Sequence, residues 1–328
     1  MPTNLPPEYF EIEREFRAAE TVQQQIALLE ELISVVPKHK GTDRLRADLR
    51  RKLSKLRERS QTRKEVGRRQ SVFRIEKEGV GQVAVVGAPN VGKSALVAAL
   101  TNATPEVSEA PFTTWEPIPG MMPVEDVQVQ LIDTPPLYRE YVEPQLMDLL
   151  RKVDLILLVV DLETHPVEQL EETLALLKEQ RIWPLRHQDR YQGERRATFK
   201  PFLIVANKAD DDEAEELFQL FCELLEEDWP CLAVSALTGR HLDRLKRAVF
   251  ERLGVMRIYA KPPGKEPDLT APFVVRKGST VEEFAGRVHK DFLETLTSAR
   301  VWGSAEFAGQ SVSRDYVLQD GDIVELRT

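Results

Sequence analysis

The sequence contains little cysteine and no long apolar run. Only two of its 328 residues are cysteine, Cys222 and Cys231, and no histidine clusters with them. Two thiols cannot make a disulfide framework or a four-ligand zinc site, so we expect a reducing compartment, the cytoplasm. The longest aliphatic run, residues 155–160, is too short to span a bilayer, and the N-terminus lacks a basic region followed by an apolar core. We expect neither secretion nor a membrane partner.

The remaining composition is that of a folded chain. Hydrophobic residues make up 42% of the sequence and charged residues 30%, which excludes collagenous, mucin-like and wholly disordered proteins. A chain of 328 residues exceeds the usual size of one domain. We therefore expect two or three structural units.

Charge is distributed unevenly along the chain. The formal net charge is −9, yet residues 38–77, called the basic arm below, contain 16 basic and 5 acidic residues. We expect this arm to attract a polyanion such as RNA while the acidic remainder does not. The alternative is a solvated basic helix that packs against an acidic surface of the same chain.

The N-terminal region has helical periodicity. Apolar residues recur at three- and four-residue steps from Glu8 to Val36, and Pro37 ends the pattern, which predicts two short helices. Asp43 then offers an N-cap to a basic helix with a narrow leucine stripe, at Leu45, Leu49, Leu53 and Leu56. We assign residues 1–78 to a helical hairpin and a basic linker.

From residue 79 the chain alternates short aliphatic runs with helical segments. The runs are residues 83–86, 127–132, 155–160, 202–206 and 231–234. Such a pattern predicts an α/β domain with a mostly parallel sheet, assigned to residues 79–260. A proline-rich linker, residues 261–267, precedes a small module of strands around one helix, residues 268–328. We expect this module to have a β-grasp fold.

The residues between the first strand and the next helix form a phosphate-binding motif. They are Gly87, Ala88, Pro89, Asn90, Val91, Gly92, Lys93, Ser94 and the following Ala95. The glycines let backbone N–H groups face the phosphates, Lys93 reaches the β- and γ-phosphates, and the Ser94 hydroxyl is a ligand for Mg²⁺. The alternative, a chance glycine-rich turn, does not account for the strand and helix on either side.

A second motif, Asn207-Lys208-Ala-Asp210, ends the strand at residues 202–206. The Asp210 carboxylate can accept hydrogen bonds from guanine N1–H and N2–H, while Asn207 and the Lys208 stem brace the base. Ser235 and Ala236 follow the next strand and would close over the base. The sequence therefore predicts selectivity for guanine.

Two further positions are expected on the metal side. Asp133 ends the strand at residues 127–132, where P-loop proteins keep an acid near Mg²⁺, although an ordinary turn residue is the alternative. Thr114, chosen over Thr113, lies in the loop that would bring a hydroxyl to the metal and act in catalysis.

These motifs, together with the final stretch from Val312 to Leu326, resemble the Obg/developmentally regulated GTP-binding protein group. The C-terminal stretch is similar to the end of a TGS domain, and the N-terminal basic helix resembles that group's helical hairpin. The resemblance implies a slow GTPase that uses Mg²⁺ and binds GTP or GDP. It also implies RNA or the ribosome as a partner, through the basic arm and the TGS-like module, with an accessory protein as a further partner.

Three positions bear on catalysis. Pro136 replaces the glycine whose N–H meets the γ-phosphate in that group, and Leu137 follows where many GTPases have a catalytic glutamine. Asn90 resembles the residue that helps bind K⁺ in potassium-stimulated GTPases, and an Asn that only stabilises the loop is an equal alternative. A non-hydrolysing adaptor that binds GTP or GDP and recruits RNA or a protein is therefore the rival function.

Overall fold

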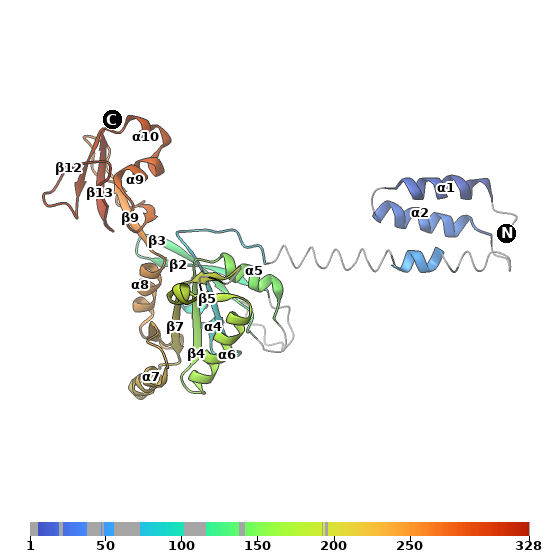
Figure 1. The fold of residues 1–328 in the computed structure, drawn as a ribbon, viewed down its shortest axis with the longest axis horizontal. Helices are drawn as coiled ribbons and strands as arrows, with labels where there is room; N and C mark the ends of the chain where they lie inside the picture. Colours follow the sequence, from blue (N-terminus) through green and yellow to red (C-terminus); the bar gives the residue numbers. More distant parts are fainter. Residues whose placement is uncertain are drawn as a thin grey trace. The chain divides into compact units, whose positions relative to one another are not determined.

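The computed structural model describes residues 6–19, 22–37, 47, 49–55, 73–101, 116–137, 142–191, 193 and 196–327. The chain forms two compact units, 1–74 and 75–328 (Figure 1). Within the described ranges, no helix has both the length and the apolar character needed to cross a membrane.

The first unit is a small helical cluster. Helices α1 (Pro7–Ala18) and α2 (Val22–Val35) contact each other, and residues 49–55 are also helical. Their core is apolar, and its buried members are Tyr9, Ile12, Leu29, Leu32, Val36 and Leu49. Phe10 is exposed, because the inward face of α1 is set by Tyr9 and Ile12.

The leucine stripe of the basic arm is used inside this unit. Leu49 is buried and Leu53 packs against the same core, so the described part of the arm is a third helical element beside α1 and α2. The basic side chains on its other faces remain exposed, namely Arg50, Arg51, Lys52 and Lys55. The rest of the arm up to residue 72, including the predicted N-cap Asp43, lies outside the described residues.

The second unit contains a six-stranded sheet in the order β2-β3-β1-β4-β7-β8. Its strands are β1 (Gln82–Gly87), β2 (Ile118–Val124), β3 (Val127–Asp133), β4 (Leu155–Asp161), β7 (Phe202–Asn207) and β8 (Cys231–Ala233). All neighbours pair in parallel except β2 and β3. The expected α/β class with a mostly parallel sheet is confirmed.

Helices cover both faces of this sheet, so the side chains on both sides of its central strands are buried. Helices α4 (Lys93–Leu100) and α8 (Leu242–Arg252) share one apolar core with alternate residues of β1, β4 and β7. Helix α6 (Pro166–Glu179) packs against β4 and β1 outside that core. The other elements are α5 (Pro144–Lys152), β5 (Ile182–Pro184), η1 (Leu185–Tyr191), β6 (Thr198–Lys200) and α7 (Asp212–Leu224).

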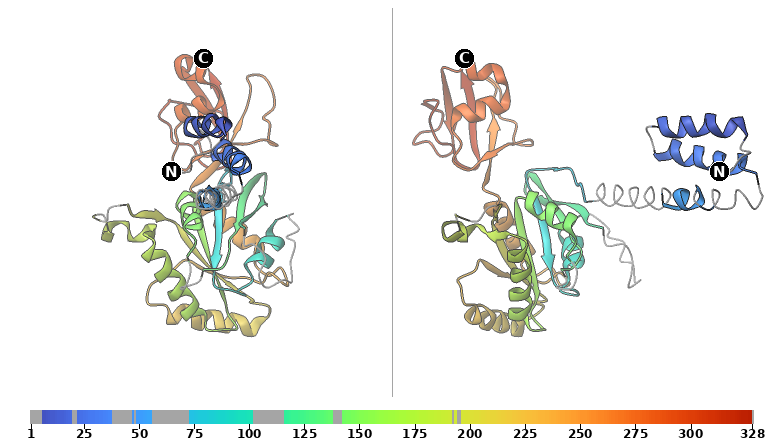
Figure 2. Two further views of the ribbon diagram at one scale, coloured as in Figure 1. Left: turned by 90° about the vertical axis from the view of Figure 1, so that its right-hand side faces the viewer. Right: turned by 45° about the vertical axis from the view of Figure 1, so that its right-hand side comes forward.

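A five-stranded sheet completes this unit, in the order β10-β9-β13-β11-β12. Its strands are β9 (Val255–Ala260), β10 (Phe273–Arg276), β11 (Ser298–Trp302), β12 (Gln310–Val312) and β13 (Asp322–Arg327). Helices α9 (Val281–Val288) and α10 (Lys290–Thr295) pack on one face of this sheet (Figure 2). One expected helix over residues 281–296 is thus two, separated at His289, which is extended and caps α10.

The structure differs from the sequence analysis around residue 260. Strand β9, which we grouped with the nucleotide-binding domain, pairs with β10 and β13 of the C-terminal sheet. The proline-rich residues 261–267 therefore lie in the loop between β9 and β10. Near Tyr316 the chain makes a single bridge, between Val317 and Thr280.

Candidate nucleotide-binding site

The phosphate-binding motif joins β1 to α4, and its glycines are required by close contacts. A Cβ on Gly87 would lie 2.3 Å from the Val159 carbonyl oxygen, and one on Gly92 would lie 2.3 Å from Asn207 Nδ2. Gly92 also has a φ of 87°, which L side chains rarely adopt. The loop therefore approaches β4 and β7 more closely than a larger residue would allow.

Lys93 is held inside this loop. Its side chain is buried, and Nζ donates hydrogen bonds to the carbonyl oxygens of Gly87 at 3.2 Å and Ala88 at 2.8 Å. Burial lowers the pKa of Lys93 to about 8, and the charge of Asp133 opposes that shift. Polyphosphate beside this ammonium group would favour its charged form, so the position suits an anionic ligand.

Ser94 and Asp133 meet as the sequence predicted. Ser94 Oγ donates a 2.6 Å hydrogen bond to Asp133 Oδ2, which brings these two residues of the expected metal side together. Asp133 Oδ1 is buried and has no hydrogen-bond partner among the described residues. Burial raises the pKa of the Asp133 carboxyl, opposed by the Ser94 hydrogen bond and the Lys93 charge. An unsatisfied oxygen beside a hydroxyl is a donor set that fits Mg²⁺.

The chain after Asp133 is tied to β1 and the phosphate loop. Thr134 is buried, and its Oγ1 donates to the Val85 carbonyl oxygen at 2.7 Å. Leu137 is also buried, and its backbone N–H donates to the Gly87 carbonyl oxygen at 3.4 Å. Thr113 and Thr114 lie outside the described residues, so their expected role remains a prediction.

Asn207 connects three separate segments of the site. Its buried side chain donates from Nδ2 to the Val91 carbonyl oxygen at 2.9 Å, and its Oδ1 accepts from the Ala236 N–H at 3.1 Å. The phosphate loop, the end of β7 and the residues after β8 are therefore held in one arrangement. Val91 takes part through its backbone carbonyl, while its side chain is buried in the sheet core.

Asp210 and Ser235, which were each predicted to lie at the base, are hydrogen-bonded to each other. Ser235 Oγ donates to Asp210 Oδ1 at 2.5 Å, and the Thr238 N–H donates to the same hydroxyl oxygen at 2.9 Å. Ser235 is fully buried, whereas Asp210 is half-buried. This contact orients the carboxylate without enclosing it, so guanine edge groups could reach it.

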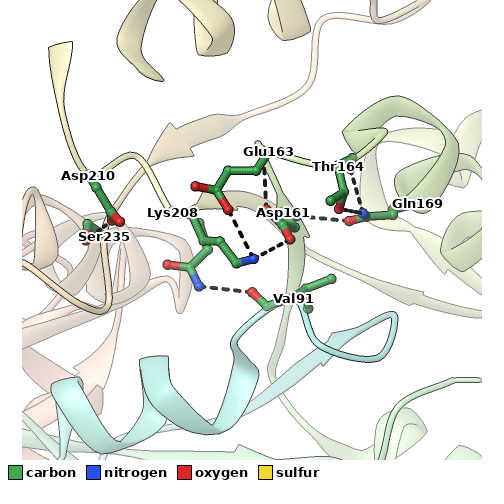
Figure 3. A network of polar contacts seen from close by, with 9 residues as sticks. Val91, Asp161, Glu163, Thr164, Gln169, Lys208, Asp210 and Ser235 are labelled. Carbon is green, nitrogen blue, oxygen red and sulfur yellow. Dashed lines mark hydrogen bonds and ion pairs between the residues drawn. The ribbon is translucent and has the colours of Figure 1, made fainter. Parts of the chain in front are cut away.

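Lys208 has partners that the sequence analysis missed. Its Nζ lies 2.6 Å from Asp161 Oδ2 and 3.4 Å from Glu163 Oε2, and the hydrogen bond to Asp161 raises the pKa of Lys208 (Figure 3). Gln169 accepts from the Asp161 N–H at 2.9 Å and steadies this turn. Asp161 follows an aliphatic strand just as Asp133 and Asn207 do, and that position was the available signal.

The predicted residues that the structure describes converge on one edge of the sheet. They lie at the carboxyl ends of β1, β3, β7 and β8, where parallel strands of this fold class place their ligands. Pro89, Asn90 and Ala95 are exposed at this edge, and Ala88 is half-buried. Among the described residues, no cluster of three or more His, Cys, Asp or Glu side chains offers a separate metal site.

Two family models match the chain. The model described as a 50S ribosome-binding GTPase matches residues 82–208, and the model of the TGS domain matches residues 256–328. The first covers β1 to Lys208, and the second begins within β9. The expected C-terminal TGS module is thereby shown.

Relatives match along nearly the whole length. An uncharacterised GTP-binding protein of Methanocaldococcus jannaschii is 31% identical, over 93% of this chain and 92% of the relative. Developmentally-regulated G-protein 3 of Arabidopsis thaliana is 28% identical, over 93% of this chain and 98% of the relative. Ribosome-interacting GTPase 1 of Saccharomyces cerevisiae is 26% identical, over 93% and 99%.

A solved structure shares the fold. The YchF GTPase of Schizosaccharomyces pombe aligns with a TM-score of 0.51 and 16% identity, covering 77% of this chain and 99% of that one. At this identity the similarity concerns the fold alone. The Methanocaldococcus relative at 31% identity and the two family models show the family. The chain belongs to the P-loop GTP-binding proteins that carry a C-terminal TGS domain.

Proposed function

We propose that the chain is a slow, Mg²⁺-dependent GTPase that converts GTP and water to GDP and phosphate. The observation that carries this proposal is Asn207, whose side chain joins the phosphate loop to the base-recognition residues through Val91 and Ala236. A site braced in this way can hold base and phosphates in one fixed geometry. Positioning and electrostatic stabilisation are what phosphoryl transfer requires of a protein.

Each group has a distinct task in this proposal. The N–H groups of the loop from Gly87 to Ser94 and the Lys93 ammonium group receive the β- and γ-phosphates at the N-terminus of α4. Asp210 accepts the guanine N1–H and N2–H, and the Lys208 stem covers the base. Lys93 exchanges its two loop carbonyl partners for phosphate oxygens when the nucleotide binds.

The metal would be held by the Ser94 hydroxyl and the Asp133 carboxylate, with Thr114 as a further ligand. The buried, unpaired Oδ1 of Asp133 beside the Ser94 hydroxyl supports this assignment. Mg²⁺ bound there supplies charge neutralisation for the phosphate oxygens. The three residues would keep the β- and γ-phosphates oriented.

Asn90 is proposed to help bind K⁺ beside the phosphates. It is exposed, it has a φ of 62°, and its side chain makes no hydrogen bond to any residue that the structure describes. The alternative, an Asn that stabilises the loop by bonding to its own backbone, lacks such a bond in this conformation. Asn tolerates the left-handed backbone better than most residues, so that part of its role is conformational.

A non-hydrolysing adaptor is the second candidate, and one contact favours it. Pro136 has no N–H, and the next N–H, from Leu137, is engaged with the Gly87 carbonyl oxygen. A γ-phosphate would therefore find no free donor at this point unless the segment moves. In this alternative, GTP or GDP stabilises the fold and the flanking units recruit RNA or a protein.

The partners proposed are RNA or the ribosome, with an accessory protein in addition. The exposed basic residues of the arm support an electrostatic contact with RNA, and the TGS domain is proposed as a second contact. The similarity to developmentally-regulated and ribosome-interacting proteins favours placement in the developmentally regulated branch. These relatives' names motivate the choice of ribosomes as the first partner to be tried.

Single-turnover hydrolysis of GTP labelled at the γ-phosphate separates the two candidates. With protein in excess over GTP and Mg²⁺ present, the GTPase proposal expects phosphate release that is faster in KCl than in NaCl at equal ionic strength. Asn90→Ala should remove the difference between the cations. Bound GTP that is recovered intact in both salts would favour the adaptor.

A further inference from the structure

Helix α7 presents an apolar face to solvent. Leu217, Leu220 and Leu224 are 48%, 52% and 59% exposed, and their spacing of three and four residues places them on one side of the helix. The adjoining flank of the helix is anchored in the domain by Ala214 and Phe221, which are buried. Single exposed leucines are ordinary, but three in a row on one helix form a continuous apolar strip.

This strip borders a groove rather than a flat surface. A cavity of about 450 Å³ lies between α7 and the start of α6, and Leu217, Leu220 and Leu224 line one side of it. Leu162, Pro166 and Val167 line the other side. The two helices contact each other, so the groove has a continuous apolar floor with Phe221 between its walls. Such a surface suits the apolar face of a helix.

The charges around the groove specify what kind of helix fits. Glu168 and Glu171 line it, and neither has an ion pair with any described residue. Helices α6 and α7 together carry nine acidic side chains and one basic one, Lys178. The acidic rim that Glu168 and Glu171 form on the α6 side complements lysine and arginine placed beside a leucine-rich stripe.

Other occupants fit less well. Nucleic acid and anionic membranes would be repelled by Glu168 and Glu171 and by the acidic character of α6 and α7. A second copy of this groove would meet it with like charge. The leucines of the chain's own basic arm that the structure describes, Leu49 and Leu53, already pack on α1 and α2. The apolar lining and the acidic rim on α6 together therefore favour a separate basic amphipathic helix.

We propose that the groove between α6 and α7 is a docking site for a basic amphipathic helix of a partner protein. The partner helix places apolar side chains at positions i, i+3 or i+4, and i+7 between the two walls, and its lysines or arginines meet Glu168 and Glu171. This surface is distinct from the phosphate loop and from the basic arm. It is independent of whether bound GTP is hydrolysed.

The probe for this site is a fluorescein-labelled peptide of about 18 residues, or about five helical turns. It carries leucines at the stated spacing and lysines on both flanks. One comparison peptide has glutamate in place of each lysine, and another has the same composition in scrambled order. Fluorescence anisotropy with the full chain is expected to show binding of the lysine peptide alone, weakening between about 50 and about 300 mM salt.

Variants test the two halves of the recognition. Leu220→Asp should weaken peptide binding at least about tenfold, because burial of one leucine contributes about 1.5 kcal/mol or more. Leu269→Asp, at another exposed leucine, is the matched control and should bind like the original chain. The double variant Glu168→Lys and Glu171→Lys should reject the lysine peptide and accept the glutamate peptide. GDP affinity and the thermal midpoint, unchanged in each variant, show that the fold is intact.

Three results would overturn the proposal. The first is equal binding of the lysine and scrambled peptides. The second is undiminished binding to Leu220→Asp. The third is self-association of the original chain in sedimentation experiments that Leu220→Asp abolishes, since the groove would then be an interface between copies of this chain.

Discussion

At the scale of single residues, the Ser94 hydroxyl is the most informative atom of the site. Ser94→Ala removes the donor to Asp133 and the proposed metal ligand together. We expect Mg²⁺-dependent GTP affinity to fall by about 1.5–3 kcal/mol, since a half-buried carboxylate loses a charge-assisted partner, with GDP affinity affected less. Calorimetry with and without EDTA measures this. The original chain should lose GTP affinity when EDTA is added. If EDTA lowers the GTP affinity of Ser94→Ala by the same factor, the assignment of Ser94 as a metal ligand is contradicted.

A second residue-scale prediction concerns the partners of Lys208. Asp161 is 6% exposed and holds Lys208 at 2.6 Å, whereas Glu163 is 61% exposed and lies 3.4 Å away. Asp161→Asn should therefore weaken GTP and GDP binding equally, by about tenfold, because a charge-assisted hydrogen bond contributes about 1.5–3 kcal/mol. Glu163→Gln is the matched control and should change little. Competition with a fluorescent nucleotide measures the GTP and GDP affinities of both variants. Equal losses of affinity in the two variants would show that Asp161 has no special role.

The difference between these positions explains what sequence reasoning could find. Lys93, Asn207 and Asp210 belong to fixed motifs whose residue types and spacing alone identify their chemistry. Asp161 belongs to no such motif, because its task is to hold another side chain rather than to touch the nucleotide. The sequence signals Asp161 only by its place at the end of an aliphatic strand, and its task becomes visible when β4 and β7 are seen side by side, with Asp161 paired to Asn207 in register.

At the scale of elements, strand β9 joins the two sheets of the second unit. It follows closely on the end of α8, at Arg252, so no long linker separates them. Arg257 on β9 is only 14% exposed and binds Asp320 Oδ2 at 2.6 Å and Asp126 Oδ1 at 3.1 Å, as well as Glu125. Its guanidinium also lies 5.1 Å from the Phe250 ring centre. The turn between β2 and β3 is thus fixed to the TGS sheet.

This contact yields a stability prediction. Arg257→Met leaves several partly buried carboxylates without their common partner, so we expect the free energy of unfolding to fall by about 2 kcal/mol. Differential scanning calorimetry measures the loss, which should shrink at low pH because the pKa of Asp320 is held below its ordinary value and its charge disappears only there. Arg276→Met, at an exposed arginine on β10, is the control. Equal melting of the two variants would show that the clamp contributes nothing.

The elements that were missed share a physical cause. Strands β1, β3, β4, β7 and β8 were predictable because strands buried on both faces need uninterrupted aliphatic residues. Strand β2 contains Pro119, Gly120 and Pro123, which argue against a strand, yet an edge strand with one free side tolerates them. Strand β9 has an ordinary strand composition, but which sheet it joins depends on pairing between distant segments.

At the scale of the whole molecule, the excess of basic residues lies in the arm, residues 38–77. Four exposed basic residues should contact RNA phosphates, so replacing Arg50, Arg51, Lys52 and Lys55 by glutamine tests the arm in the full chain. We expect the log–log salt slope of binding to single-stranded RNA to fall by about 0.7 for each phosphate that the variant no longer neutralises. Filter binding or anisotropy over a range of KCl concentrations gives the slope.

A matched control distinguishes the arm from the second unit. It carries four glutamines at exposed basic residues there, in place of Arg244, Arg247, Arg276 and Lys277. This control should keep the original slope. If it binds RNA more weakly while the arm variant does not, recognition belongs to the second unit and the arm helix has a structural role.

The most direct measurement joins the base-recognition residues to hydrolysis. Single-turnover phosphate release is followed for the original chain and for Asp210→Asn, each with GTP and with XTP. Asparagine donates where aspartate accepts, so the variant should prefer the C2 oxygen of xanthine to the guanine amino group, and the two substrates should exchange by about 100-fold or more. The account predicts GTP hydrolysis by the original chain and XTP hydrolysis by Asp210→Asn. Unchanged GTP hydrolysis by the variant, or none of either nucleotide by either protein, would contradict it.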